Sequence, residues 1–142
     1  MGLMYAPHTV TLINAYDNGG TMVYQATVLP GVFLDVRHSS LAESLGAQNS
    51  DSVELFIPFD VQAERQYISP KAFRAAADKS GYWTIESSDG NSASPCYFVR
   101  GEVDGLSYKE ARKTYDDVFT VTSVLTRDFG DEAMHHWQVG GR

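Results

Sequence analysis

The sequence predicts a mainly β protein, folded as one antiparallel β barrel or sandwich of about eight strands with one short helix and a long loop. Three observations support this fold class. The 142 residues match one domain of ordinary size, so we treat residues 1–142 as a single β domain. Apolar residues recur at a two-residue period in five segments, and turn-forming residues separate these segments at barrel or sandwich spacing. Eight Tyr and seven Phe residues add to the preference for strands.

The first two strands are predicted to form a hairpin. Residues 9–16 and 21–29 are strand-like, and the second run places apolar side chains at every second position. Between them lies the sequence Asp17-Asn18-Gly19-Gly20, in which Asn and Gly tolerate the positive φ that tight hairpin turns require. The sequence therefore predicts a β-hairpin over residues 9–29.

Pro30-Gly31 is expected to end this hairpin, and the alternation that follows predicts a third strand over residues 32–37. Residues 39–51 are small, polar and turn-rich, which predicts a long mobile loop. A fourth strand over residues 53–57 is expected to end at Pro58.

The pair Ser69-Pro70 predicts the start of the helix, because serine caps a first turn and proline suits the first helical position. This helix is expected to be short and to close near Gly81. The segments that follow are predicted strands over residues 82–86 and 96–100 and a helical turn over residues 108–115.

Residues 118–127 carry the strongest strand signal, because they are rich in β-branched side chains. A strict two-residue period places Phe119, Val121, Ser123 and Leu125 on one face and Val118, Thr120, Thr122 and Val124 on the other. A last strand is expected over residues 134–139, followed by a flexible tail at about residues 140–142.

The charge balance disfavours a tight grip on nucleic acid. The chain has 18 acidic and 11 basic residues, a net charge of -7 and a pI of about 4.9, so it lacks the cationic surface that releases counterions from DNA. No run approaches 18 consecutive apolar residues, and the N-terminus has no signal-peptide pattern. We therefore expect a soluble protein that makes no membrane contact and is not exported by this route.

No GxSxG, HExxH, P-loop or paired CxxC motif occurs, so we expect no enzymatic activity, no cofactor and no metal. His135 and His136 are adjacent, and neighbouring residues of a strand point to opposite faces, so the two rings are not expected to hold one ion. Cys96 is the only cysteine. It lies in an apolar run and is expected to be a buried thiol with a raised pKa rather than a nucleophile.

The two tryptophans, Trp83 and Trp137, allow two interpretations. Aromatic side chains in strands commonly close the core, but they also anchor interfaces and line ligand pockets. A pocket lined by Trp83, Tyr97 and Trp137 would indicate a small β-barrel ligand-binding protein or enzyme.

The order of features along the chain resembles that of a known protein family. The marks are the opening strand pair that ends in VLPGVFLD, the apolar IPF strand, and the ending DDVFTVTSV…RDFG…HWQVGG. This arrangement resembles the minor structural proteins of tailed bacteriophages, namely the minor capsid, head-completion and head-tail connector group. The resemblance spans nearly the whole chain and implies no catalytic residue.

The resemblance implies a mostly β protein that is made in the host cytoplasm and forms a ring at the head-tail neck of the virion. Its expected partners are further copies of itself, the portal or adaptor, the tail proteins, and double-stranded DNA that passes without tight binding. A tail terminator or tail-tube subunit is the alternative within the same class. Leu41 and Leu45 of the long loop, together with Trp137, are the candidate inter-subunit contacts, and the loop is expected to become ordered only on assembly.

Overall fold

Ten elements follow one another along the chain of the computed structural model, which describes residues 7–37, 52–87, 96–128, 130 and 134–142. Their bounds are β1 His8–Asn18, β2 Thr21–Arg37, β3 Ser52–Pro58, β4 Gln66–Tyr67, α2 Pro70–Ala75, β5 Tyr82–Trp83, β6 Cys96–Arg100, α3 Tyr108–Thr114, β7 Val118–Arg127 and β8 His136–Gly141. The predicted long loop 39–51, with Leu41 and Leu45, lies outside the described residues.

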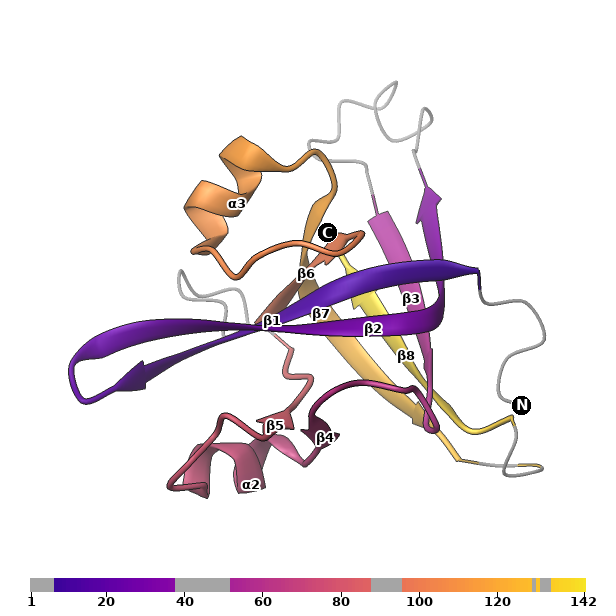
Figure 1. Cartoon of the computed structure of the whole chain (residues 1–142). Coiled ribbons are helices and arrows are strands. Elements are labelled where there is room, and N and C mark those ends of the chain that lie inside the picture. The colour runs from indigo at the N-terminus through magenta and orange to yellow at the C-terminus, as the bar shows by residue number, and fades with distance from the viewer. Residues whose placement is uncertain (1–6, 38–51, 88–95, 129, 131–133) are drawn as a thin grey trace.

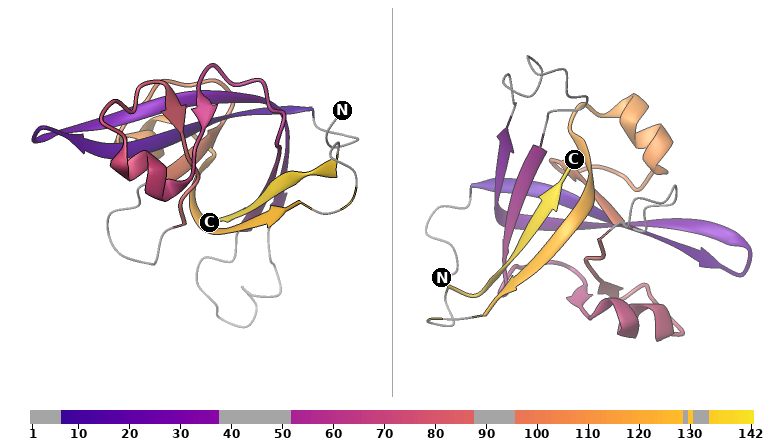
Figure 2. Two further views of the ribbon diagram at one scale, coloured as in Figure 1. Left: turned by 90° about the horizontal axis from the view of Figure 1, so that it is seen from below. Right: turned by 180° about the vertical axis from the view of Figure 1, so that it is seen from behind.

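Six of the strands close into a barrel with the order β1-β2-β3-β8-β7-β6, in which every neighbouring pair is antiparallel (Figure 1). The predicted mainly β, antiparallel fold is confirmed. β1 is hydrogen-bonded to β2 along its whole length, but it pairs with β6 only from Val10 to Asn14. The distal part of the β1–β2 hairpin therefore projects beyond the barrel, with α3 on one side of it and α2 on the other (Figures 1 and 2).

The expected break at Pro30-Gly31 is wrong, because β2 continues through both residues. Thr9 is the register partner of Pro30, and His8 is the partner of Val32, so Gly31 is an extra residue in the ladder. Gly31 has φ 69°, a conformation that favours glycine, and such a bulge tolerates a proline beside it. The strand bends here, and it pairs with β1 up to Val32 and with β3 from Phe33 onward (Figure 1).

The predicted face assignment along β7 holds only for its first half. Phe119 and Val121 are buried, but Ser123 and Leu125 are exposed and Val124 packs against the core. Val121 pairs with Gly141 and Ser123 pairs with Gly140, which leaves Thr122 without a register partner. This one-residue bulge reverses which positions face inward beyond it, because side chains alternate between the two faces of a strand.

The chain end is part of the barrel, so the expected flexible tail at residues 140–142 is wrong. Gly140 and Gly141 belong to β8, which lies between β3 and β7. Arg142 then exchanges two backbone hydrogen bonds of 3.1 Å with Thr120. The lack of a side chain at Gly141 is required there, since a Cβ atom would lie 2.9 Å from Val53 Cγ2 and 3.0 Å from Phe98 Cζ.

Two short helices flank the barrel in the part of the chain that the structure describes. The predicted start of α2 is confirmed, because the Ser69 hydroxyl accepts a hydrogen bond from the Ala72 N–H and Pro70 opens the helix. α2 ends at Ala75, before the expected Gly81. The predicted helical turn over residues 108–115 is α3, whose first turn is capped by Ser107.

The predicted strand over residues 82–86 is shorter than expected. Only Tyr82 and Trp83 form β5, which pairs in parallel with the two-residue β4. The sequence did not predict β4, because two residues are too few to establish a strand period.

The buried apolar side chains of the described residues form two clusters. The larger fills the barrel, with Leu12, Leu55 and Phe98 among its fully buried members. The smaller is formed by Ile13, Tyr97, Val99 and Ala111, and it holds α3 against the outer side of the hairpin and β6. The Tyr97 hydroxyl donates a hydrogen bond to the Leu106 carbonyl just before α3.

Candidate functional site: an aromatic pocket and a projecting hairpin

Trp83 and Trp137 meet at one end of the barrel, although 53 positions separate them in the sequence. Their ring centroids are 5.7 Å apart, and Tyr67 of β4 lies 5.2 Å from Trp83 and 4.4 Å from Trp137. Phe59, just after β3, adds a fourth ring 4.5 Å from Trp137. Such tilted and edge-on arrangements are the favourable ones for aromatic pairs, so the four rings form a cohesive cluster.

This cluster borders a pocket of about 380 Å³. The lining residues are Phe59, Val61, Arg65, Gln66, Tyr67, Trp83 and Trp137. Trp83 and Trp137 are only 1% and 7% exposed and lie deep, whereas Phe59 is 37% exposed. The two tryptophans therefore close the core, as one of the two interpretations expected, and their aromatic neighbours extend from the core to a pocket open to solvent. We call this site the aromatic pocket.

The expected grouping of Trp83, Tyr97 and Trp137 is wrong, because Tyr97 belongs to the second cluster beneath α3. Tyr67 takes its place in the pocket, and Phe59 and Arg65 complete it. Burial raises the pKa of the Tyr67 hydroxyl, which keeps this group neutral. Sequence patterns did not identify Tyr67 or Arg65, because only the parallel pairing of β4 with β5 brings them beside Trp83.

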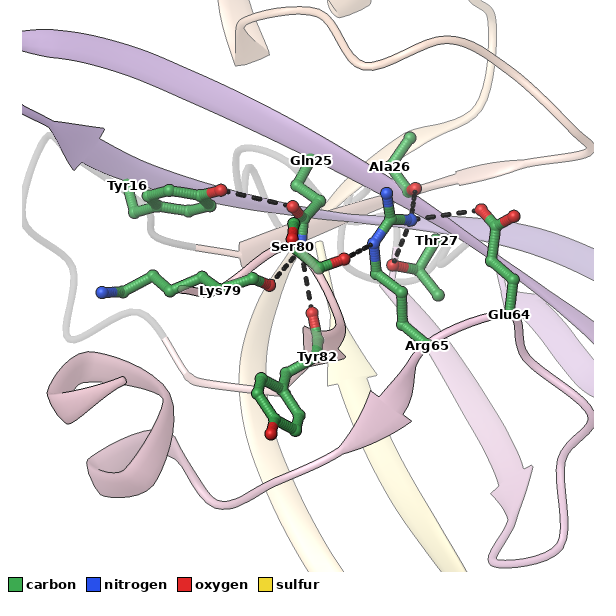
Figure 3. Close-up of polar contacts among 9 residues, drawn as sticks. All are labelled: Tyr16, Gln25, Ala26, Thr27, Glu64, Arg65, Lys79, Ser80 and Tyr82. Atoms are coloured by element: carbon green, nitrogen blue, oxygen red, sulfur yellow. Dashed lines mark hydrogen bonds and ion pairs between the residues drawn. The ribbon is translucent and has the colours of Figure 1, made fainter. Parts of the chain in front are cut away.

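Arg65 holds the wall of the pocket in place. Its Nε donates to the Ser80 carbonyl at 2.7 Å, and its Nη1 donates to the Ala26 carbonyl at 2.6 Å (Figure 3). The same Nη1 contacts the Thr27 hydroxyl at 3.4 Å and the Glu64 carboxylate at 3.1 Å. One guanidinium thus joins the β4–α2–β5 segment to β2.

Gln25 provides a second polar connection between these parts. Its Nε2 donates to the carbonyls of Lys79 and Tyr82, both at 2.9 Å, and its Oε1 accepts from the Tyr16 hydroxyl at 3.2 Å (Figure 3). The Tyr16 ring in turn makes an edge contact with Phe73 of α2, at 5.7 Å between centroids. The hairpin is therefore supported as far as Tyr16, and its tip lies beyond this support.

The tip of the hairpin carries an apolar side chain that is about half exposed to solvent. Met22 is 49% exposed, and its register partner across the hairpin is the exposed Asp17. One Asp17 oxygen accepts the Gly20 N–H at 2.8 Å, and Gly19 and Gly20 adopt φ 62° and 91°. The predicted turn is confirmed, and it presents Asp17 and Met22 side by side.

A second, acidic groove of about 590 Å³ lies between β2 and the segment that precedes α3. Glu64, Glu102 and Asp104 contribute its carboxylates, and Tyr115 lines it as well. Within the described part of the chain, no group of three His, Cys, Asp or Glu side chains is arranged to hold a metal ion.

The adjacent residues His135 and His136 contact two different aromatic side chains. The His135 ring lies 5.7 Å from Phe59, and its Nε2 is 3.3 Å from the Gly130 carbonyl oxygen. The His136 ring lies 5.8 Å from Phe56, and its Nδ1 is 2.8 Å from the Met134 carbonyl oxygen. Each ring thus has its own neighbours among the described residues.

Cys96 is fully buried, and burial raises its pKa to about 12. Its Sγ lies 3.8 Å from both the Asn14 amide nitrogen and the Thr84 carbonyl oxygen. The expectation of a buried thiol with a raised pKa is confirmed, and such a thiol is a poor nucleophile.

These features define a closed, six-stranded antiparallel β-barrel protein with a projecting hairpin and an aromatic pocket at one end. The chain belongs to a family of unknown function, DUF6751, whose model matches residues 5–142. No curated protein matches the chain, and no solved structure does. Neither helix in the described part of the chain is long and apolar enough to cross a membrane.

Proposed function

We propose that this chain is a non-enzymatic structural protein of a tailed-phage virion, where it forms a ring at the head-tail neck, links the portal to the tail and lines the DNA channel. The proposal starts from the resemblance of the sequence to head-completion and connector proteins. Its partners are further copies of the chain, the portal or adaptor, and the tail proteins.

The observation that carries the proposal is the projecting hairpin. Beyond Asn14, β1 has no strand partner other than β2 among the described residues, and the tip exposes Met22. An isolated two-stranded ribbon gains little stability in water, so a projecting arm is better explained by contacts made outside the subunit. Unpaired strand edges and an exposed apolar side chain are suited to subunit contacts.

The charge of the chain supports a place beside DNA without tight binding. A net charge of -7 repels the phosphate backbone and avoids the counterion release that makes basic surfaces adhere to DNA. The buried Cys96 and the separated histidines add no chemistry that would favour an enzyme.

A tail terminator or tail-tube subunit is the alternative within the same class, since such proteins share the need for ring contacts. A different class is favoured by the aromatic pocket, whose volume of about 380 Å³ lies within the range of small-molecule sites. In that case the chain is a small β-barrel ligand-binding protein or enzyme, and a ligand that enters the pocket will change the fluorescence of Trp83 and Trp137.

The experiment that tests the proposal is inactivation of the gene in its phage, followed by electron microscopy of the lysate. If the chain is a neck protein, the mutant lysate should contain DNA-filled or leaking heads beside complete, unattached tails. Antibodies against the chain should label wild-type virions at the neck. Tails of abnormal length together with intact heads indicate the terminator or tube role. Normal virions that lack the protein overturn the virion assignment altogether.

A further inference from the structure

We propose that the hairpin tip of one copy docks into the aromatic pocket of a second copy, with Met22 entering the pocket and Asp17 facing Arg65. This contact rests on the self-association in the proposed function and specifies which surfaces meet. We call Asp17 and Met22 together the knob.

The knob combines one apolar and one acidic side chain on the same face. Asp17 and Met22 are direct register partners in the antiparallel hairpin, and opposite residues of such a pair point to the same side. Met22 is the most exposed of the large apolar side chains in the described residues. Methionine is flexible and polarisable, so it adapts to an irregular aromatic cavity and makes favourable sulfur–aromatic contacts.

The aromatic pocket offers the complementary chemistry. Phe59, Val61 and Tyr67 give it apolar walls, and Arg65 is the only charged side chain among the described residues that line it. Arg65 keeps its contacts with Ala26 and Glu64, so the Asp17 carboxylate would approach a guanidinium that is already fixed in position. An aromatic cluster with a preorganised arginine has the composition typical of interface hot spots.

A copy cannot place its own knob in its own pocket. The tip projects from the barrel away from β4 and β5 in all three views (Figures 1 and 2). The knob and the pocket are therefore different surfaces of one chain, and their contact between copies is head-to-tail. Contacts of this kind close into rings when the rotation between subunits allows it, which is the assembly that the proposed function needs.

The test uses the full-length protein and sedimentation velocity over a range of concentrations. The wild type is expected to form rings as concentration rises. Met22→Asp is expected to raise the concentration needed for half-assembly at least tenfold, because it places a charge in the apolar pocket. Leu125→Asp is the matched control, since Leu125 is 46% exposed, lies on β7 outside both surfaces and receives the same change. This control should assemble like the wild type.

A mixing experiment separates the two halves of the contact. Phe59→Asp spoils the pocket and leaves the knob intact, whereas Met22→Asp does the reverse. Neither variant alone should assemble, but an equimolar mixture should form dimers and no rings, because only one productive contact is possible between them. Trp83 and Trp137 are the only tryptophans, so the emission of the Phe59→Asp and Met22→Asp mixture should shift as dimers form.

Circular dichroism and thermal melting of each variant establish that it folds. If folded Met22→Asp still forms rings at wild-type concentrations, the knob-and-pocket contact is overturned, but the proposed ring assembly is not. Equal loss of assembly in Leu125→Asp and Met22→Asp also overturns it. A wild type that stays monomeric at every concentration and within isolated virions overturns both the contact and the proposed self-association.

Discussion

The side-chain amide of Asn14 makes two hydrogen bonds with the backbone of Thr84, one as donor and one as acceptor. The Asn14 Nδ2 donates to the Thr84 carbonyl at 2.8 Å, and the Asn14 Oδ1 accepts the Thr84 N–H at 3.3 Å. Both residues are buried, so this amide satisfies the two backbone groups that no water reaches. The contact fixes the chain after β5 against β1 and thereby positions Trp83 at the base of the aromatic pocket.

Replacement of this amide should be costly. Asn14→Ala leaves the Thr84 N–H buried without this partner and its carbonyl with only the weak Cys96 thiol at 3.8 Å, so we expect a loss of about 2–4 kcal/mol in unfolding free energy. Asn18→Ala is the control, because Asn18 is exposed near the turn, and it should change stability by no more than about 0.5 kcal/mol. Urea denaturation measures both values, and similar stabilities for the two variants would contradict the role given to Asn14.

The close approach at Gly141 gives a second prediction. In Gly141→Ala the new methyl group meets Val53, Phe98 and the Thr120 carbonyl within about 3 Å, so we expect a loss of about 1–3 kcal/mol from overpacking. Gly81→Ala is the matched change, because a Cβ there has nothing within 4 Å. Thermal denaturation should leave Gly81→Ala near the wild type. A tolerant Gly141 would mean that the end of β8 is not held in the barrel.

The Arg65 contacts predict a local effect on the β4–α2–β5 segment. Arg65→Ala removes hydrogen bonds to Ser80 and Ala26, and each such charge-assisted bond contributes about 1.5–3 kcal/mol. Hydrogen exchange over residues 66–83 should rise strongly, while exchange in β7 and β8 changes little. Arg65→Lys should not restore protection, since an ammonium group cannot reproduce the planar fork.

Arg74→Ala serves as the control for this experiment. Arg74 pairs with Glu86, but its side chain is largely exposed, and exposed ion pairs contribute about 0–1 kcal/mol. If Arg74→Ala and Arg65→Ala open the segment equally, Arg65 is not the connection that holds it.

Burial of Cys96 predicts a loss of stability in alkali. Its pKa is about 12 in the folded protein against an ordinary value of 9.0, so the unfolded chain loses its thiol proton first as the pH rises. The stabilisation by the neutral thiol is therefore complete below pH 9 and is lost progressively toward pH 12, at about 1.4 kcal/mol per pH unit. Between about pH 8 and pH 10, the wild type should lose about 1.4 kcal/mol more stability than Cys96→Ala.

The comparison with Cys96→Ala is needed because Tyr67 and Tyr97 also have pKa values raised by burial, and both variants keep these tyrosines. An independent measurement is the rate at which a thiol reagent labels Cys96, which should follow global unfolding rather than surface exposure. Rapid labelling of the native protein, or equal alkaline losses in the two proteins, would contradict the buried environment.

Local sequence signals predicted most strands and the start of α2, because they depend on neighbours in the chain. Asp17 to Gly20 define their turn through backbone preference alone, and Ser69-Pro70 define a helix start in the same way. The pattern misled where one residue was inserted into a ladder. Neither the bend at Gly31 nor the bulge at Thr122 can be recognised from the amino-acid composition of its strand. Beyond the bulge, however, the side chains of β7 point to the opposite faces from those predicted.

The candidate site was less predictable, because its members converge only through long-range pairing. Trp83 and Trp137 could be singled out as aromatic side chains, but their contact depends on β8 lying beside β3 and on β4 pairing with β5. Tyr67 and Arg65 carry no local signal. Gly140 and Gly141 led us to expect a flexible tail, because glycine is common in such tails. In the structure these two glycines allow neighbouring strands to pack closely.

The strand order of the barrel has a consequence for how the chain folds. β8 is the last element along the chain, yet it lies between β3 and β7, and β1 pairs with the distant β6. β8 must therefore take its place between β3 and β7 before the hydrogen-bonded ring is complete. Until then β3 and β7 remain open to other chains, and the many sequence-distant pairings favour slow closure. Barrel closure is thus expected to be slow, and the chain is expected to be most prone to aggregation before β8 is in place.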